Sequence, residues 1–178
     1  MANTSGGGAA TNAHGLWFEQ ETSLASALEN AGYTVMGNYV YVNGKQAAWI
    51  SRSRKDLYKY FLEPAGIDWT SLLSKRMYPD EAFYNLNTRY MYIIEKKFQN
   101  SSGSVDEKLQ TCDFKKKQYC RLLGAMGIWV EYLYVCNDWF RQDVYQDVIA
   151  YINSVGCHIV FNEIPLYYLG LPELGKEG

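Results

Sequence analysis

Two acidic residues and a lysine are spaced so that they could hold a metal ion and act on a bound substrate. Asp80 follows a proline, and fourteen residues separate it from Glu95, which opens the triplet Glu95-Lys96-Lys97 after an apolar run. One or two carboxylates suit Mg²⁺, which keeps several waters when a protein binds it. A nearby lysine stabilises negative charge that develops during a reaction. These residue types suit cleavage of a phosphodiester bond, which needs a divalent cation, a positioned water and a further positive charge.

The two acids are expected on neighbouring strands. Residues 82–86 and 90–97 both have the composition of strands. Side chains alternate along a strand, so Glu95 and Lys97, two residues apart, share one face. Asp80 begins the neighbouring strand, from which it can meet Glu95 across a hairpin. The alternative is that Glu95 and Lys97 form a surface pair on an edge strand.

The array Pro79-Asp80…Glu95-x-Lys97 resembles the signature of the PD-(D/E)XK nuclease superfamily, which includes many restriction endonucleases. The resemblance implies that Asp80 and Glu95 hold Mg²⁺ and that Lys97 orients the attacking water. It also implies that the backbone carbonyl of Lys96 is a metal ligand. The Lys96 side chain points to the opposite face by strand alternation.

A glutamate on the first helix is a further feature of that superfamily. Residues 17–31 predict a helix, because apolar residues recur at helical spacing and a glycine follows. Glu21 falls on the apolar stripe, where an unpaired acid is costly, and a metal site would explain it. We therefore expect Glu21 to join Asp80 and Glu95 as a catalytic residue and metal ligand, with Glu19 as second choice. The alternative is a first-turn acid that the helix dipole favours.

The remaining pattern predicts an α/β domain. Residues 33–50 alternate around Asn43-Gly44, a dipeptide typical of tight hairpins. Further elements are expected in this order: short helices at 54–62 (ended by Pro64) and 69–75 (capped by Asp68), a loop at 99–104, a helix at 113–126, a strand at 128–136, a helix at 138–155, a strand at 157–161 and a tail with little regular pattern.

The order helix, three strands, helix, strand matches the αβββαβ restriction-endonuclease-like core that the resemblance implies. This core has a mixed central sheet flanked by helices, here with an extra C-terminal helix and strand. The resemblance covers about residues 19–161. Within it, residues 94–99 and 103–111 are also similar to segments of bacterial restriction-type nucleases.

Several basic and amide side chains are expected to contact DNA. The expected set is Arg52, Arg54, Lys55, Lys108 and Gln118. The first three alternate with serine hydroxyls in residues 51–55, a mixture that suits phosphate contacts. Gln118 shares a helical face with apolar residues and could approach the site, although a partly exposed helix residue is the alternative. The lysine run 115–117 predicts a solvated helix face or further phosphate contacts.

Length and composition fit one globular domain. The 178 residues predict a single domain at 16–178 after a flexible arm at 1–15. The net charge of −2 does not indicate a protein that binds nucleic acid. Carboxylates that surround a metal would, however, cancel the charge of basic residues in this total and still leave basic patches on the surface.

No apolar run suits a membrane span, and the N-terminus lacks a signal-peptide pattern. The four cysteines form no CxxC pair, so we expect free thiols in a cytoplasmic protein, with disulfides or a metal site as the alternative.

These features predict a Mg²⁺-dependent endonuclease acting on double-stranded DNA, as a type II restriction endonuclease. A homodimer is expected, because two active sites are needed to cut both strands together. One alternative is a homing, repair or junction-resolving nuclease of the same fold. Another is a DNA-binding relative without catalysis, which the full set of Asp80, Glu95 and Lys97 disfavours, because buried charges without a function destabilise a core.

Overall fold

The computed structural model describes residues 14–175, apart from the side chain of Asp106. The flexible arm predicted at 1–15 therefore lies outside the described residues, except for its last two positions. Gly15, one of these two, belongs to a strand, so the folded domain begins before the predicted boundary at residue 16.

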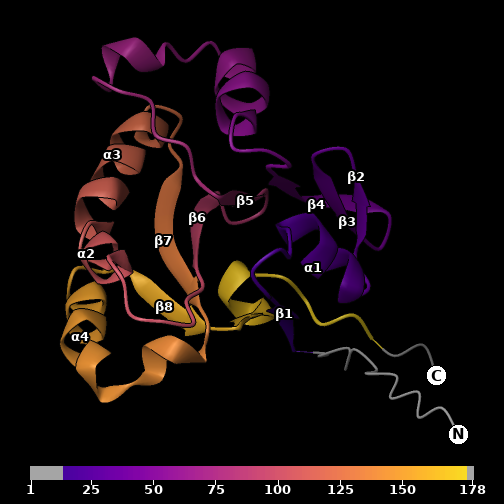
Figure 1. The fold of residues 1–178 in the computed structure, drawn as a ribbon. Coiled ribbons are helices and arrows are strands. Elements are labelled where there is room, and N and C mark those ends of the chain that lie inside the picture. The colour runs from indigo at the N-terminus through magenta and orange to yellow at the C-terminus, as the bar shows by residue number, and fades with distance from the viewer. Residues whose placement is uncertain (1–13, 176–178) are drawn as a thin grey trace, which may run out of the picture.

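A seven-stranded mixed sheet forms the centre of the fold (Figure 1). Its strands lie side by side in chain order: β2 (Thr34–Met36), β3 (Tyr39–Val42), β4 (Lys45–Ile50), β5 (Glu81–Asn85), β6 (Tyr90–Lys97), β7 (Trp129–Cys136) and β8 (His158–Phe161). Neighbours from β2 to β6 are antiparallel, whereas β6–β7 and β7–β8 are parallel. A separate antiparallel pair joins β1 (Gly15–Trp17) to β9 (Glu163–Pro165). The predicted α/β class with a mixed sheet is confirmed.

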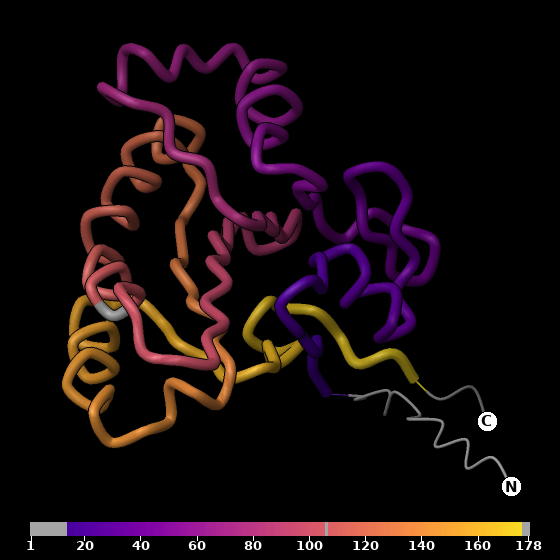
Figure 2. The backbone as a smooth tube through the Cα atoms, in the orientation of Figure 1, coloured from indigo at the N-terminus to yellow at the C-terminus, as the bar shows by residue number. Residues whose placement is uncertain are grey.

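Helices cover both faces of this sheet. Figure 1 shows α2, α3 and α4 on one side of β6, β7 and β8, and α1 on the other. The α-helices are α1 (Leu24–Asn30), α2 (Val105–Leu109), α3 (Cys112–Gly124) and α4 (Gln146–Ser154). Short helical segments are η1 (Leu57–Leu62), η2 (Glu63–Ala65) and η3 (Trp69–Ser71) between β4 and β5, η4 (Asp138–Arg141) and η5 (Asp143–Tyr145) before α4, and η6 (Leu166–Leu169) after β9. Figure 2 shows the β4–β5 connection as an arch at one end of the molecule.

Strand alternation divides the core into two layers, one on each face of the sheet. Met91 and Ile93 of β6 pack in the buried cluster that includes α3, whereas Tyr92 and Ile94 pack in the cluster that includes α1. Both layers bury apolar side chains, which fixes the direction in which each β6 residue points. Because Glu95 is two residues beyond Ile93, its side chain is directed towards the α3 face.

The first helix is shorter than the sequence pattern predicts. A helix is expected over 17–31, but α1 spans only Leu24–Asn30. Ser23 caps α1, because its hydroxyl accepts the N–H of Ser26 at 3.1 Å, and residues 15–17 pair with β9 instead. Glu21 lies in an exposed turn before this cap, so the prediction that it occupies an apolar helical stripe is wrong.

Local turn and cap signals are confirmed, and long-range elements differ from the prediction. Asn43 and Gly44 form the predicted turn, with φ values of 51° and 74°. The Asp68 cap is present, because its Oδ1 accepts the N–H of Thr70 at 3.0 Å. In contrast, β2 was not expected as a separate strand, α4 begins at Gln146 rather than at 138, and the tail contains β9 and η6. All four cysteines have free thiols, as predicted.

Candidate active site

The pairing of β5 with β6 brings together Asp80 and Glu95, which we call the acid pair. Glu81 of β5 pairs with Ile94 of β6. In an antiparallel register the preceding residue, Asp80, therefore lies beside Glu95. The Oδ2 atom of Asp80 accepts the backbone N–H of Lys96 at 3.0 Å. Asp80 and Glu95 thus meet across the hairpin, as the strand pattern predicts.

Glu95 is the more buried member, with 6% of its side chain exposed. Its Oε2 atom lies 3.5 Å from Nζ of Lys97 and 3.9 Å from Nζ of Lys115 on α3. Burial raises the pKa of the Glu95 carboxyl, and the charge of Asp80 adds to this shift. The charges of Lys115 and Lys97 lower it and favour the ionised form. The two lysines thereby offset part of the cost of burying a carboxylate.

Two tyrosines close the site on the side of the core. Tyr119 of α3 and Tyr132 of β7 are buried, and their ring centroids are 6.4 Å apart. Burial raises the pKa of both phenols, and the charge of Glu95 raises both further. These neutral rings keep water away from one side of Glu95, which strengthens the electrostatic interactions of its carboxylate.

The Lys96 side chain points to the α1 face, as strand alternation predicts. Its Nζ donates to the carbonyl of Thr22 at 2.8 Å and lies 3.4 Å from Oε1 of Glu81. The same oxygen of Glu81 accepts the N–H of Leu24, the first residue of α1, at 3.1 Å. Burial raises the pKa of Glu81, and the charge of Lys96 opposes this shift. The side chains of Lys96 and Glu81 therefore attach α1 to the sheet.

Glu21, predicted as a catalytic residue and metal ligand, lies apart from the acid pair. It is exposed, and together with Glu19 it lines a surface hollow next to α1. Its neighbour Thr22 contacts Lys96 on the α1 face, whereas Glu95 is directed towards α3. The structure therefore does not bring Glu21 or Glu19 to the acid pair, because the chain is still in a turn at these positions.

The loop that carries Arg54 contacts the acid pair directly. Nη2 of Arg54 donates a hydrogen bond to Oδ1 of Asp80, and the two side chains form an ion pair. The buried carboxylate of Asp56 holds this loop, because its Oδ2 accepts the N–H groups of Arg52 and Ser53 at 2.8 and 3.2 Å. Burial acts to raise the pKa of Asp56, but hydrogen bonds from Ser53 and Arg52 bring it below its usual value.

The other predicted DNA contacts are surface residues. Arg52, Lys55 and Lys108 have exposed side chains, and the Arg52 guanidinium donates to the carbonyl of Gly37 at 3.2 Å. Gln118 is half-buried on α3, where its Oε1 accepts a hydrogen bond from Arg121 at 3.4 Å. Of the predicted set, Arg54 is the residue that the structure joins to the acid pair.

Sequence reasoning missed the roles of Lys115 and Glu81. Lys115 was grouped with its neighbours as a run of helix lysines, but the three diverge: Lys116 contacts Glu131 and Lys117 contacts Asp113. The position of Lys115 in α3 indicates that it faces the sheet. Lys115 is four residues before the buried Tyr119, so the two side chains lie on the same face of the helix. Glu81 could have been recognised as an inward-facing acid on β5, opposite in direction to Asp80.

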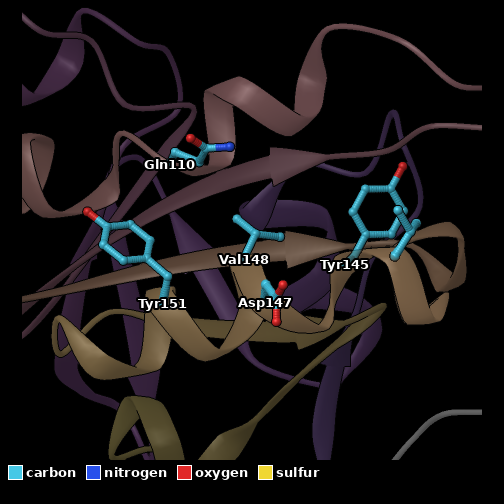
Figure 3. A pocket seen from close by; sticks show the side chains of 6 residues that line it. Gln110, Tyr145, Asp147, Val148 and Tyr151 are labelled. Carbon is cyan, nitrogen blue, oxygen red and sulfur yellow. The ribbon is translucent and has the colours of Figure 1, made fainter.

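A hollow of about 470 Å³ lies elsewhere, beside α4. It is lined by Gln110, Val144, Tyr145, Asp147, Val148 and Tyr151. Figure 3 shows Gln110 on one side of it and the side chains from α4 on the other. Among the described side chains of this lining, Asp147 is the single carboxylate, and the acid pair and its lysines do not belong to this hollow.

The donor set of the acid pair fits Mg²⁺. Among residues 14–175, no group of three or more His, Cys, Asp or Glu side chains is arranged to hold a metal. Mg²⁺ does not require such a group, because it is commonly bound through one or two carboxylates, substrate phosphates and water. The backbone N–H of Lys96 points to Asp80, and in a strand the carbonyl of the same residue points to the same side. Two carboxylates and one carbonyl thus provide oxygen ligands of the kind that Mg²⁺ prefers.

No protein-family model, curated protein or solved structure matches this chain. Over the described residues, none of the helices has both the length and the apolar character needed to cross a bilayer.

The interaction between Lys115 and Glu95 can be measured by a double-mutant cycle. We expect Lys115→Met to lower the free energy of unfolding in EDTA by about 1 kcal/mol, because the buried carboxylate of Glu95 loses one of its two neighbouring cations. In a Glu95→Gln background the same change should cost little. Lys117→Met is the control, because its pair with Asp113 is exposed and follows the i, i+4 spacing, worth about 0.3–0.5 kcal/mol. Equal costs in both backgrounds would show that Lys115 and Glu95 do not interact.

The role of Asp56 in holding the Arg54 loop predicts a pH dependence of stability. Asp56→Ala removes the acceptor of two backbone N–H groups and should lower stability at pH 7 by roughly 2–3 kcal/mol. The pKa of Asp56 is lowered in the folded protein. Its contribution is therefore complete above the ordinary aspartate pKa of about 4 and is lost as the pH falls through the lowered value. Urea unfolding of both proteins should show a constant difference from pH 7 to about pH 4.5; a difference that shrinks within this range would contradict the assignment.

Proposed function

We propose that this chain is a Mg²⁺-dependent endodeoxyribonuclease of the PD-(D/E)XK type. The observation that carries the proposal is the arrangement at the end of β6. There Asp80 lies beside the buried Glu95, and Lys97 shares the face of Glu95 with its Nζ 3.5 Å from the carboxylate. This arrangement combines two oxygen donors with a positive charge, which are the groups that phosphodiester hydrolysis requires.

The topology supports the same proposal. Helix α1 is followed first by β2 and β3, then by the antiparallel strands β4, β5 and β6, and then by α2, α3 and β7, which is parallel to β6. With β2 and β3 left out, this order is similar to the αβββαβ order of the superfamily that the sequence motif resembles. On this interpretation β2 and β3 extend the sheet at one edge, while α4 and β8 are additions at the other.

Each residue of the site has a distinct task in the proposed reaction. Asp80 and Glu95 would hold the metal through their carboxylates, with the carbonyl of Lys96 as a further donor. A bound Mg²⁺ supplies charge stabilisation at the phosphate and favours ionisation of a bound water. Lys97 orients the attacking water and stabilises negative charge that develops on the phosphate oxygens. The rings of Tyr119 and Tyr132 exclude water from the side of the core.

The proposed substrate is double-stranded DNA, and the proposed assembly is a homodimer with the role of a type II restriction endonuclease. A dimer places two acid pairs on one duplex, so that each cuts one strand. Arg54 stands at the acid pair, where a phosphate would approach, and Arg52 and Lys55 extend the positive charge along the same loop. These cations suit the DNA backbone.

Incubation of the purified protein with phage DNA and Mg²⁺ tests this function. Discrete fragments support restriction-like cleavage, and their absence in EDTA supports dependence on the metal. A continuous smear would instead indicate a nuclease without sequence preference, as in a repair role. Intact DNA that is nevertheless retained by the protein would indicate a binding relative without catalysis. Sedimentation with and without a duplex tests the proposed dimer.

The acid pair is expected to be essential. Asp80→Asn and Glu95→Gln each remove a charged metal ligand with little change of shape, so cleavage should fall to background while cooperative melting is retained. Glu29→Gln is the control, because Glu29 is an exposed residue of α1. Cleavage of a radiolabelled duplex under single-turnover conditions provides the measurement. Wild-type rates in either acid variant would exclude this site.

The neighbours Lys96 and Lys97 should differ in their effect on the rate, although the loss of either removes a cation beside a buried glutamate and should lower stability. Lys97→Ala removes a cation from the reacting face and should lower the single-turnover rate by about 10²–10³, with cooperative melting retained. Lys96→Ala leaves Glu81 buried without its lysine and should lower the melting temperature. The folded fraction of that variant should cleave within about tenfold of the wild type. A larger loss of rate for Lys96→Ala than for Lys97→Ala would contradict the assigned roles.

A further inference from the structure

The loop that carries Arg54 is anchored at the solvent side of the acid pair. Ser51, at the start of its loop, exchanges hydrogen bonds with β5: its backbone N–H donates to the carbonyl of Ala82 at 2.9 Å, and its hydroxyl accepts the N–H of Ala82 at 2.8 Å. At the other end, Asp56 binds the loop as described above. The loop is therefore anchored on both sides of Arg54, directly beside Asp80.

Both carboxylate oxygens of Asp80 are engaged in the structure. Oδ2 accepts the N–H of Lys96, and Oδ1 accepts Nη2 of Arg54. The backbone donor belongs to β6 and cannot leave without disturbing the sheet. The arginine donor is at the end of a long side chain that is 62% exposed, so its departure requires only a change of rotamer.

A divalent cation at Asp80 competes with the Arg54 guanidinium. Both are positive, and Oδ1 is the oxygen of Asp80 that the N–H of Lys96 leaves free, so a cation held by Asp80 would repel the guanidinium. Binding of the metal therefore releases the guanidinium, while the anchored loop keeps it within reach of the site. A released guanidinium binds a phosphate through two parallel hydrogen bonds, for which its planar shape is suited.

We propose that Arg54 exchanges Asp80 for a DNA phosphate when the metal binds, and that this exchange couples the binding of metal and DNA. The inference rests on the proposed function and adds its regulation. Without metal, Arg54 neutralises Asp80 and is withheld from DNA. With metal, the same side chain becomes a phosphate contact. Because coupling between two ligands is reciprocal, DNA raises the affinity for the metal by the same factor.

Metal binding without DNA provides the first test. We expect Arg54→Ala to bind Mn²⁺ about two- to fivefold more tightly than the wild type in electron paramagnetic resonance titrations, because a competing ion pair is removed. Arg52→Ala is the matched control: it removes the same charge from the same loop, but its guanidinium contacts the carbonyl of Gly37 and not Asp80. Its Mn²⁺ affinity should equal that of the wild type.

DNA affinity provides the second test, in the Lys97→Ala background so that the duplex stays intact. Fluorescence anisotropy of a labelled duplex in Mg²⁺ and in EDTA gives the ratio of the two affinities. Adding Arg54→Ala should reduce this ratio severalfold, because its phosphate contact depends on the metal. Adding Arg52→Ala should weaken binding equally in both conditions and leave the ratio unchanged.

The outcomes separate the two proposals. Tighter Mn²⁺ binding together with a reduced ratio in the Arg54 variant supports the exchange. If the protein binds Mn²⁺ and DNA but Arg54→Ala changes neither the Mn²⁺ affinity nor the ratio, the exchange is wrong and the proposed function stands. If the wild type binds no Mn²⁺, the proposed function fails and the exchange fails with it. Melting curves of each variant show whether it is folded.

Discussion

The end of β6 carries charges on both faces of the sheet, and their separation by strand alternation is the constraint on which the site depends. Glu95 and Lys97 point towards α3, whereas Lys96 points towards α1, where it meets Glu81. Apolar residues fix the direction of every preceding side chain in β6. The neighbouring lysines of this strand therefore have different contacts. Lys96 joins α1 to the sheet, and Lys97 lies beside Glu95. A shift of register by one residue would reverse these assignments.

Electrostatic balance explains why two carboxylates can stand together beside a protein core. Asp80 is neutralised by Arg54 at the solvent side, and Glu95 by Lys97 and Lys115 from the sheet and from α3. The cations come from three separate chain segments, so the site is completed only when these segments pack. Such an arrangement leaves little net charge at the acid pair, and on the proposed function the same cations could turn to DNA phosphates.

Local patterns predicted those parts of the structure that depend on few residues. The turn at Asn43-Gly44 and the meeting of Asp80 with Glu95 follow from backbone preferences and strand alternation, which nearby residues determine. The start of α1 was mispredicted because apolar spacing extended into a segment that pairs with β9, a partner far along the chain. Lys115 was missed for a related reason: only the packing of α3 on the sheet distinguishes it from the adjacent lysines. The periodicity of one segment does not indicate which distant segment it pairs with or packs against.

The pairing of β1 with β9 brings the two ends of the described chain together. Gly15 pairs with Pro165, and the phenol of Tyr33 donates to the carbonyl of Pro172, so the first and last described segments are neighbours. Chains whose ends adjoin tolerate being joined there and reopened at exposed loop tips. The turn at Asn43-Gly44 is such a tip, and opening it leaves the β5–β6 register intact. The arrangement that brings Asp80 to Glu95 therefore does not depend on the order in which the elements are covalently linked, and a circularly permuted chain should retain the acid pair.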